Sequence, residues 1–306
     1  MALFTYDDTS RREDLLSIIR DVSPAASNYL VTNLATSTAY NTLHEWPIRN
    51  ISRYTADQSV VEGSTPSEPT GDAPTRSNNV TATFQMGVKV TGTEAAVRRA
   101  LPGSAMDDEK KVKLIRLKAA MEWALLNGAK ASGNDTTARN MAGIDGVIST
   151  NLTNRNSGCS MSTTELEDIL QNSWDAVADG FVADVILCPM GIKRKIASFT
   201  TGVTRYTDEP DHIYNNVALY ESSSGVVKII PHKDVKQDSA ASGTSSHVYA
   251  IREEFYKMAF LTGREPKYEP LAKTGDFEIG EYVTELTLES MAERASVHRF
   301  GYNKTG

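Results

Sequence analysis

Residues 106–127 read MDDEKKVKLIRLKAAMEWALLN, and this run predicts one long α-helix. Ser104 stands at the N-cap position, and the acidic residues after Met106 place negative charge at the positive end of the helix dipole. Gly128 occurs where a helix ends, and no Gly or Pro interrupts the run. At a rise of about 1.5 Å per residue the helix would be about 33 Å long. An element of that length is a candidate for the backbone of the whole subunit.

This helix has two apolar stripes on opposite sides, at about 100° per residue. The first stripe contains Leu114, Leu117, Met121, Ala124 and Leu125, and the second contains Val112, Ile115, Ala119, Trp123 and Leu126. Polar ridges separate them, formed by Lys111, Lys118 and Glu122 on one side and by Lys113 and Arg116 on the other. Both stripes must be shielded from water. We expect one stripe to pack on the subunit's own sheet and the other to pack against a loop, an arm or a neighbouring subunit. The alternative is that the helix lies at the centre of one large core.

The composition excludes several classes of protein. The chain has 306 residues, enough for about two domains, and a net charge of −7 from 32 Lys and Arg against 39 Asp and Glu. A dedicated nucleic-acid-binding protein needs a basic surface for phosphate contacts, so the acidic balance argues against that class. The two cysteines lie far apart in sequence and predict no disulfide framework. No apolar run approaches the ~18 residues of a membrane span, and the N-terminus lacks the apolar core of a signal peptide.

A long loop precedes the helix and lies between two alternating runs. His44, Trp46 and Ile48 alternate as in a strand, and a second, perfect alternation runs from Val80 to Val90. The residues between them, 49–79, form a polar segment with several Gly and Pro residues. A loop of that length in a compact domain usually serves function or contacts outside the domain. We therefore predict a hairpin-like projection, preceded by an extended arm.

The pattern after the long helix predicts a second module. Residues 129–160 have no clear pattern, and then Ser162 and Glu165 form a capping box at the start of a helix. A buried strand at 182–187 follows, and Pro189 suits the first turn of another helix. These elements predict an inserted α/β module from about residue 161. The alternating strands after Val248 are expected to form the sheet under the long helix.

The sequence contains no motif for catalysis or for phosphate binding. It has no Walker loop, no GxGxxG run, no GxSxG elbow and no HExxH pair. The histidines are scattered, and none stands at ligand spacing with a carboxylate or with another histidine. Cys188 is interpreted as a buried structural thiol, because no base can be assigned to it. We therefore predict no catalytic, cofactor-binding or metal-binding residues.

In order and spacing, several segments resemble the major capsid proteins of tailed double-stranded DNA phages, which have the Hong Kong 97-like fold. The segments are Arg12-Glu13-Asp14-Leu15, His44-Glu45-Trp46, Val90-Thr91-Gly92-Thr93, 121–127, 226–231 and 270–276. The resemblance implies an α+β protein with an N-terminal arm at 1–43 and an extended E-loop at 44–92. It further implies a peripheral domain at 93–160 and 251–306, which holds the spine helix 106–127, and an inserted α/β axial domain at 161–250.

The function that the resemblance implies is structural, not enzymatic. Many copies would form hexamers and pentamers that close into the icosahedral shell of a virion around packaged double-stranded DNA, touching the DNA by weak non-specific contacts. Assembly would take place in the host bacterial cytoplasm, without cofactor or membrane, and with portal and decoration proteins as further partners. Because family-like residues begin almost at Met1, we expect a separate scaffolding protein, or none.

The subunit interface is expected where the loop of one subunit meets the long helix of the next. In this hypothesis the loop contributes Glu62, Pro66 and Glu68, and the helix contributes Lys113, Arg116 and Trp123. Pairing of the charged residues inside one subunit, or their plain solvation, is the alternative. Two other functions stay open: another virion protein, such as a decoration or tail-tube protein, and a cytoplasmic enzyme with an unrecognised site in the α/β module.

Overall fold

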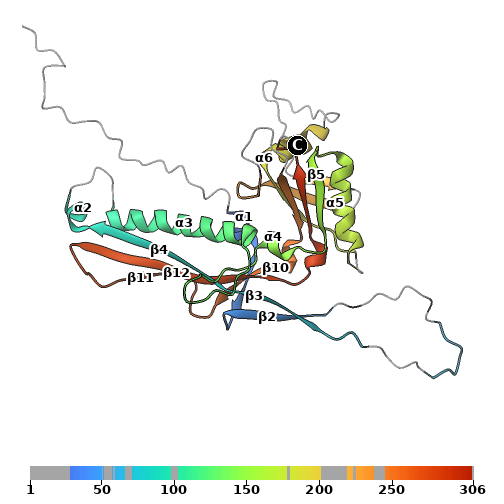
Figure 1. Cartoon of the computed structure of the whole chain (residues 1–306), viewed down its shortest axis with the longest axis horizontal. Helices are drawn as coiled ribbons and strands as arrows, with labels where there is room; N and C mark the ends of the chain where they lie inside the picture. The colour runs from blue at the N-terminus through green and yellow to red at the C-terminus, as the bar shows by residue number, and fades with distance from the viewer. Residues whose placement is uncertain are drawn as a thin grey trace, which may run out of the picture.

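The computed structural model describes residues 28–49, 51, 57, 59–65, 71–97, 103–177, 180–200, 219–222, 225–237 and 245–304. These residues form two modules, one elongated around the long helix and one built on a six-stranded sheet, with a two-stranded ribbon that projects from the body (Figure 1). Within this part of the chain, no helix combines the length and the apolar character that a membrane crossing requires.

The elongated module places the helix α3 (Ala105–Asn127) on a five-stranded sheet. The sheet has the order β1 (Ala35–Ala39), β10 (Tyr256–Leu261), β12 (Phe277–Ser290) and β11 (Lys267–Pro270), and β4 (Ala82–Thr91) also pairs with β12. The antiparallel register of β4 and β12 runs from Thr91 opposite Phe277 to Ala82 opposite Leu286. Figure 1 shows α3 running along β4 and β12. The expected sheet under the helix is confirmed for β10, β11 and β12, and β1 and β4 also belong to it. The expectation is wrong for residues 248–251 and 297–302, which lie in the other sheet.

The two ends of α3 are explained by local chemistry. The hydroxyl of Ser104 accepts a hydrogen bond from the backbone N–H of Met106 at 3.2 Å, as an N-cap does. At the other end, a side chain at Gly128 would place its Cβ 2.5 Å from the carbonyl oxygens of Ala124 and Met141. Only glycine fits that close approach, so the helix ends where the sequence predicts.

The second module is a six-stranded sheet covered on one face by two helices. Its order is β5 (Leu152–Cys159), β13 (Val297–Tyr302), β9 (Ser246–Ile251), β6 (Val185–Cys188), β8 (Gly225–Pro231) and β7 (Leu219–Ser222). The covering helices are α5 (Thr163–Asp175) and α6 (Met190–Ala197). The hydroxyl of Ser162 accepts from the backbone N–H of Glu165 at 3.1 Å, the first half of the predicted capping box.

The boundaries of this module differ from the expected range of 161–250. Strands β5 and β13 lie in the six-stranded sheet, although the sequence placed 152–159 and 297–302 with the long helix. Strand β13 lies between β5, with which it is parallel, and β9, with which it is antiparallel. Neither pairing leaves a local signature, because the partners lie far apart in the chain.

The projecting ribbon consists of β2 (Leu43–Ile48) and β3 (Thr75–Val80), paired antiparallel with Leu43 opposite Val80. The strand predicted over 80–90 is confirmed as β4, but it begins at Ala82, because the chain leaves the ribbon at Thr81 and joins another sheet. The buried side chain of Asn79 holds this corner. Its amide nitrogen donates to the carbonyls of Ala142 at 3.0 Å and Leu288 at 2.8 Å, and its oxygen accepts from the N–H of Ala142 at 2.9 Å.

The core is shared between the two modules. One cluster joins Leu117 and Leu125 of α3 to Val185 and Tyr249 of the six-stranded sheet, and a second lies between that sheet and helices α5 and α6. The remaining short elements are α1 (Tyr29–Asn33), α2 (Gly92–Ala96), α4 (Ile144–Val147) and the 3-10 turns η2 (Ser198–Thr200), η3 (Glu253–Phe255) and η4 (Glu293–Ala295). Helices α1 and α4 both contact α3, close to where the two modules join.

Candidate assembly interface

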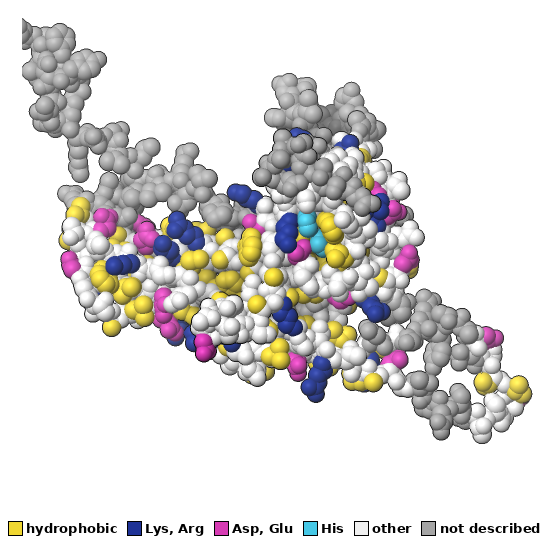
Figure 2. Space-filling model, in the orientation of Figure 1, with side chains coloured by type: hydrophobic (Ala, Val, Ile, Leu, Met, Phe, Trp, Pro, Cys, Tyr) yellow, Lys and Arg dark blue, Asp and Glu magenta, His cyan; other side chains and the backbone are white. Residues whose placement is uncertain are grey.

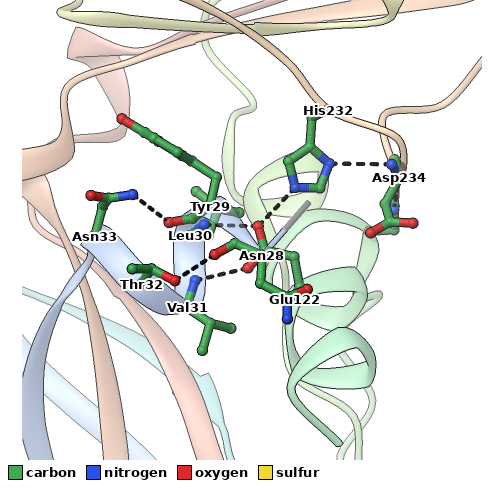
Figure 3. A network of polar contacts seen from close by, with 10 residues as sticks. Asn28, Tyr29, Leu30, Val31, Thr32, Asn33, Glu122, His232 and Asp234 are labelled. Carbon is green, nitrogen blue, oxygen red and sulfur yellow. Dashed lines mark hydrogen bonds and ion pairs between the residues drawn. The ribbon is translucent and has the colours of Figure 1, made fainter. Parts of the chain in front are cut away.

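A buried carboxylate organises the junction of α3, α1 and the six-stranded module. Glu122 of α3 accepts hydrogen bonds from the backbone N–H groups of Leu30 at 2.7 Å and Val31 at 2.8 Å, both in α1. Its Oε1 also lies 2.7 Å from Nε2 of His232, just after β8 (Figure 3). The sequence places Glu122 in a polar ridge with Lys111 and Lys118, but its side chain is fully buried, and these donors replace water around it.

The contacts of His232 define which of its nitrogens donates. Its Nδ1 accepts the backbone N–H of Asp234 at 3.2 Å, so in this arrangement Nε2 holds the proton and donates to Glu122. On the other side, Asn127 at the end of α3 donates to the carbonyl of Asp234 at 2.8 Å. The junction thus connects one helix to two other parts of the chain and fixes α1 across α3 (Figure 3). Helix α1 of the same chain therefore covers the face of α3 that carries Glu122.

Next to this junction, the surface of α3 is open. The side chain of Trp123 is 52% exposed, although it occupies a position in the second apolar stripe. Arg116 is exposed as well. Lys113 is half-buried, with its Nζ 3.9 Å from the carboxylate of Glu109 one turn earlier. The described residues thus leave a large aromatic side chain uncovered on the same helix as these basic groups.

The far end of the projection is also apolar and uncovered. Val60 and Val61 are 78% and 82% exposed, and Glu62 follows them in an exposed turn that Gly63 completes with φ 85°. Figure 2 shows hydrophobic side chains at this end of the molecule, far from the body. Two further residues of the hypothesis, Pro66 and Glu68, lie outside the described residues.

The structure does not bring the expected loop and helix residues together within one chain. Figure 1 shows the ribbon of β2 and β3 directed away from the body that holds α3. Among the described residues, no ion pair joins Glu62 to Lys113 or Arg116. Any contact between these residues would therefore have to form between subunits.

Two expectations about reactive side chains have different outcomes. Cys188 is fully buried, and burial raises the pKa of its thiol to about 12, which confirms the interpretation as a structural cysteine. The histidines are less scattered than their spacing indicates. His247 and His298 lie together beside Asp145, a cluster that the sequence does not reveal because the three residues come from α4, β9 and β13.

Comparison with known proteins gives a consistent set of relatives. A family model described as SU10 major capsid protein matches residues 3–299. A search of curated proteins finds no match. Several solved structures match nearly the whole chain. One is the capsid of a native GTA particle, with 10% sequence identity, a TM-score of 0.62 and coverage of 97% of each chain. The capsid of the myovirus XM1 follows at 11%, a TM-score of 0.56 and coverage of 94% of this chain and 96% of that one. The holo-SrpI encapsulin complex from Synechococcus elongatus matches at 11%, a TM-score of 0.59 and coverage of 97% and 94%.

Proposed function

The chain belongs to the SU10 major capsid protein family, and from this premise we propose that its copies assemble as hexamers and pentamers into a closed icosahedral shell around packaged double-stranded phage DNA. Its fold is the Hong Kong 97-like capsid fold, and its role is that of a shell-forming capsid protein. The role proposed for it in the shell is structural and includes no catalytic step. Because the net charge is −7, we expect contact with DNA to be weak and non-specific.

The observation that carries the proposal is the pair of uncovered apolar surfaces. Val60 and Val61 stand at the end of a projection, and Trp123 stands half-exposed on α3. We propose that the projection of one subunit lies on a neighbour and that Trp123 is covered in the shell. Burial of the two valines alone would contribute about 3 kcal/mol per contact. Repeated over every subunit, contacts of that size stabilise a closed assembly.

Charge supports the same arrangement. The projection offers the carboxylate of Glu62, and α3 offers Arg116 and the partly engaged Lys113. We propose that Glu62, with Pro66 and Glu68 of the same loop, meets Lys113, Arg116 and Trp123 of a neighbouring subunit. Such pairs contribute little affinity when exposed but fix the register of two surfaces.

Each segment of the chain can be assigned to a region of the capsid fold. We propose that residues 1–43 form the N-terminal arm, that residues 44–92 form the E-loop region and that α3 is the spine helix of a peripheral domain. The axial domain would be the six-stranded module, now including β5 and β13 in addition to 161–250. A separate scaffolding protein, a portal and decoration proteins are proposed as partners, with assembly in the cytoplasm of the bacterial host and residence in the virion.

Negative-stain microscopy tests the proposal. The chain would be expressed in bacteria, alone and together with the other head proteins of its phage, and purified by sedimentation. Shells or ring-shaped capsomers are expected. A monodisperse monomer under all of these conditions would contradict the proposal. The variant Trp123→Ala should form fewer shells while the subunit stays folded. The half-exposed side chain contributes less to the stability of the monomer than to an interface that buries it.

A further inference from the structure

Three side chains with metal-binding atoms meet where α4 approaches the six-stranded sheet. Nδ1 of His247 lies 2.8 Å from Nε2 of His298, and Oδ1 of Asp145 lies 3.8 Å from the first nitrogen and 3.6 Å from the second. These residues are not part of the junction around Glu122 or of the surfaces proposed for assembly. The cluster therefore requires its own explanation.

The fold brings these residues together from distant parts of the chain. His298 of β13 is opposite Tyr249 of β9, and His247 is opposite Phe300, so both histidines project from one face of the sheet. Asp145 lies in the first turn of α4, which contacts the end of α3. Hydrogen bonds to the carboxylate hold it in place, from the hydroxyl of Tyr249 to Oδ1 at 2.8 Å and from Lys236 to Oδ2 at 2.5 Å.

The three ligand atoms lie close enough together to share one metal ion. A triangle with sides of 2.8, 3.6 and 3.8 Å has a point in its plane about 2.0 Å from all three corners, which is the usual length of a zinc–imidazole or zinc–carboxylate bond. A tetrahedral ion would replace the hydrogen bond between the two imidazoles and move these rings apart by side-chain rotation. Two imidazoles and one carboxylate are the donor set of zinc and similar transition metals, whereas magnesium and calcium prefer oxygen.

The site is buried on one side and open on the other. The side chain of His298 is only 4% exposed, while those of His247 and Asp145 are 14% and 19% exposed. An ion therefore has a path from solvent, and water can fill the position that the three residues leave free. Figure 2 shows histidine side chains reaching the surface of this module, next to basic and hydrophobic groups.

We propose that Asp145, His247 and His298 bind one divalent transition metal ion, with zinc as the preferred ion and water as the fourth ligand. The bound ion would tie α4, and with it the end of α3, to two central strands of the six-stranded sheet. Lys236 opposes binding, because its ammonium group occupies Oδ2 of the same carboxylate. The site does not depend on assembly, so a failure of the proposed shell function would leave this inference untouched.

Metal titration of the untagged full chain tests the proposal. After treatment with a chelator, the protein is titrated with Co²⁺ and followed by visible absorption, and then Zn²⁺ is added as a competitor. We expect saturation at about one ion per chain and displacement by Zn²⁺. In His247→Ala and His298→Ala the affinity should fall by at least about 10- to 100-fold. The matched control is His44→Ala, which removes a histidine from the ribbon and should leave binding unchanged.

Lys236→Met supplies a variant that is expected to gain affinity. It frees Oδ2 of Asp145 and removes the competing positive charge, so Zn²⁺ should bind more tightly than to the wild type. A purely structural cluster would show no such gain. If the wild type binds Co²⁺ no better than His247→Ala does, or if Lys236→Met does not change the affinity, the proposal is overturned.

Discussion

The Nε2 atom of His232 lies 2.7 Å from Oε1 of Glu122, a contact that joins α3 to the end of β8 across 110 positions of the chain. The same carboxylate accepts the N–H groups of Leu30 and Val31. One carboxylate thus joins three segments of the chain. Removal of this carboxylate would leave its hydrogen-bond donors unpaired.

Glu122→Gln should destabilise the fold by about 2–3 kcal/mol, because the new amide group places its own N–H hydrogens against backbone or imidazole donors. The unfolding midpoint in urea measures the effect. Glu109→Gln is the matched control on the same helix. It removes a partly exposed pair with Lys113 and should cost less than about 1 kcal/mol. Equal midpoints for the two variants would disprove the role given to Glu122.

Asn79→Asp should weaken the corner from which the projection leaves the body. The change removes the amide hydrogens that meet the carbonyls of Ala142 and Leu288, and it places a carboxylate against them in the core. We expect a loss of about 3 kcal/mol in the free energy of unfolding. Asn134→Asp, in an exposed turn where the side-chain oxygen only accepts, keeps its bonds to Thr136 and Thr137 and is the control. Unchanged stability of Asn79→Asp would contradict this account.

Reversing charge on α3 should impair assembly and leave the subunit folded. In Lys113→Glu with Arg116→Glu, the proposed partners on a neighbouring loop become repelled, so fewer shells should form at moderate salt. Sedimentation and microscopy count the shells, and circular dichroism checks the fold. Lys111→Glu with Lys118→Glu makes the same charge change on the other ridge and should assemble normally.

A compensating change sharpens this test. Glu62→Lys with Glu68→Lys should restore assembly to the reversed helix, because the charges then attract again. If the doubly reversed protein assembles no better than the helix variant alone, the loop and the helix do not meet in the shell.

Cys188 should be unreactive toward a thiol reagent in the folded protein up to at least about pH 10. Its pKa is raised to about 12, and only the thiolate reacts, so the thiol stays protonated until well above the ordinary range. Partly exposed Cys159 should account for the labelling of the native chain, and both cysteines should react in denaturant. Modification of Cys188 before unfolding, mapped by mass spectrometry, would show that this strand end opens.

The parts of the fold that the sequence predicted are those with local patterns. Helix α3 follows from its cap and length, and α5 from the pair of Ser162 and Glu165. Strand β13 escaped prediction because its partners β5 and β9 lie far away along the chain. Glu122 was misplaced for the same reason. Its donors stand 91 to 110 residues away, and nothing in the helix pattern indicates that they cover it.

The core that continues from α3 into the six-stranded sheet has a mechanical consequence. Because Leu117, Leu125, Val185 and Tyr249 share one apolar cluster, bending between the two modules would open buried surface to water. We expect the two modules of each subunit to move as one rigid body. A shell built from such subunits would accommodate a change in curvature at the ribbon of β2 and β3, which extends outside this core.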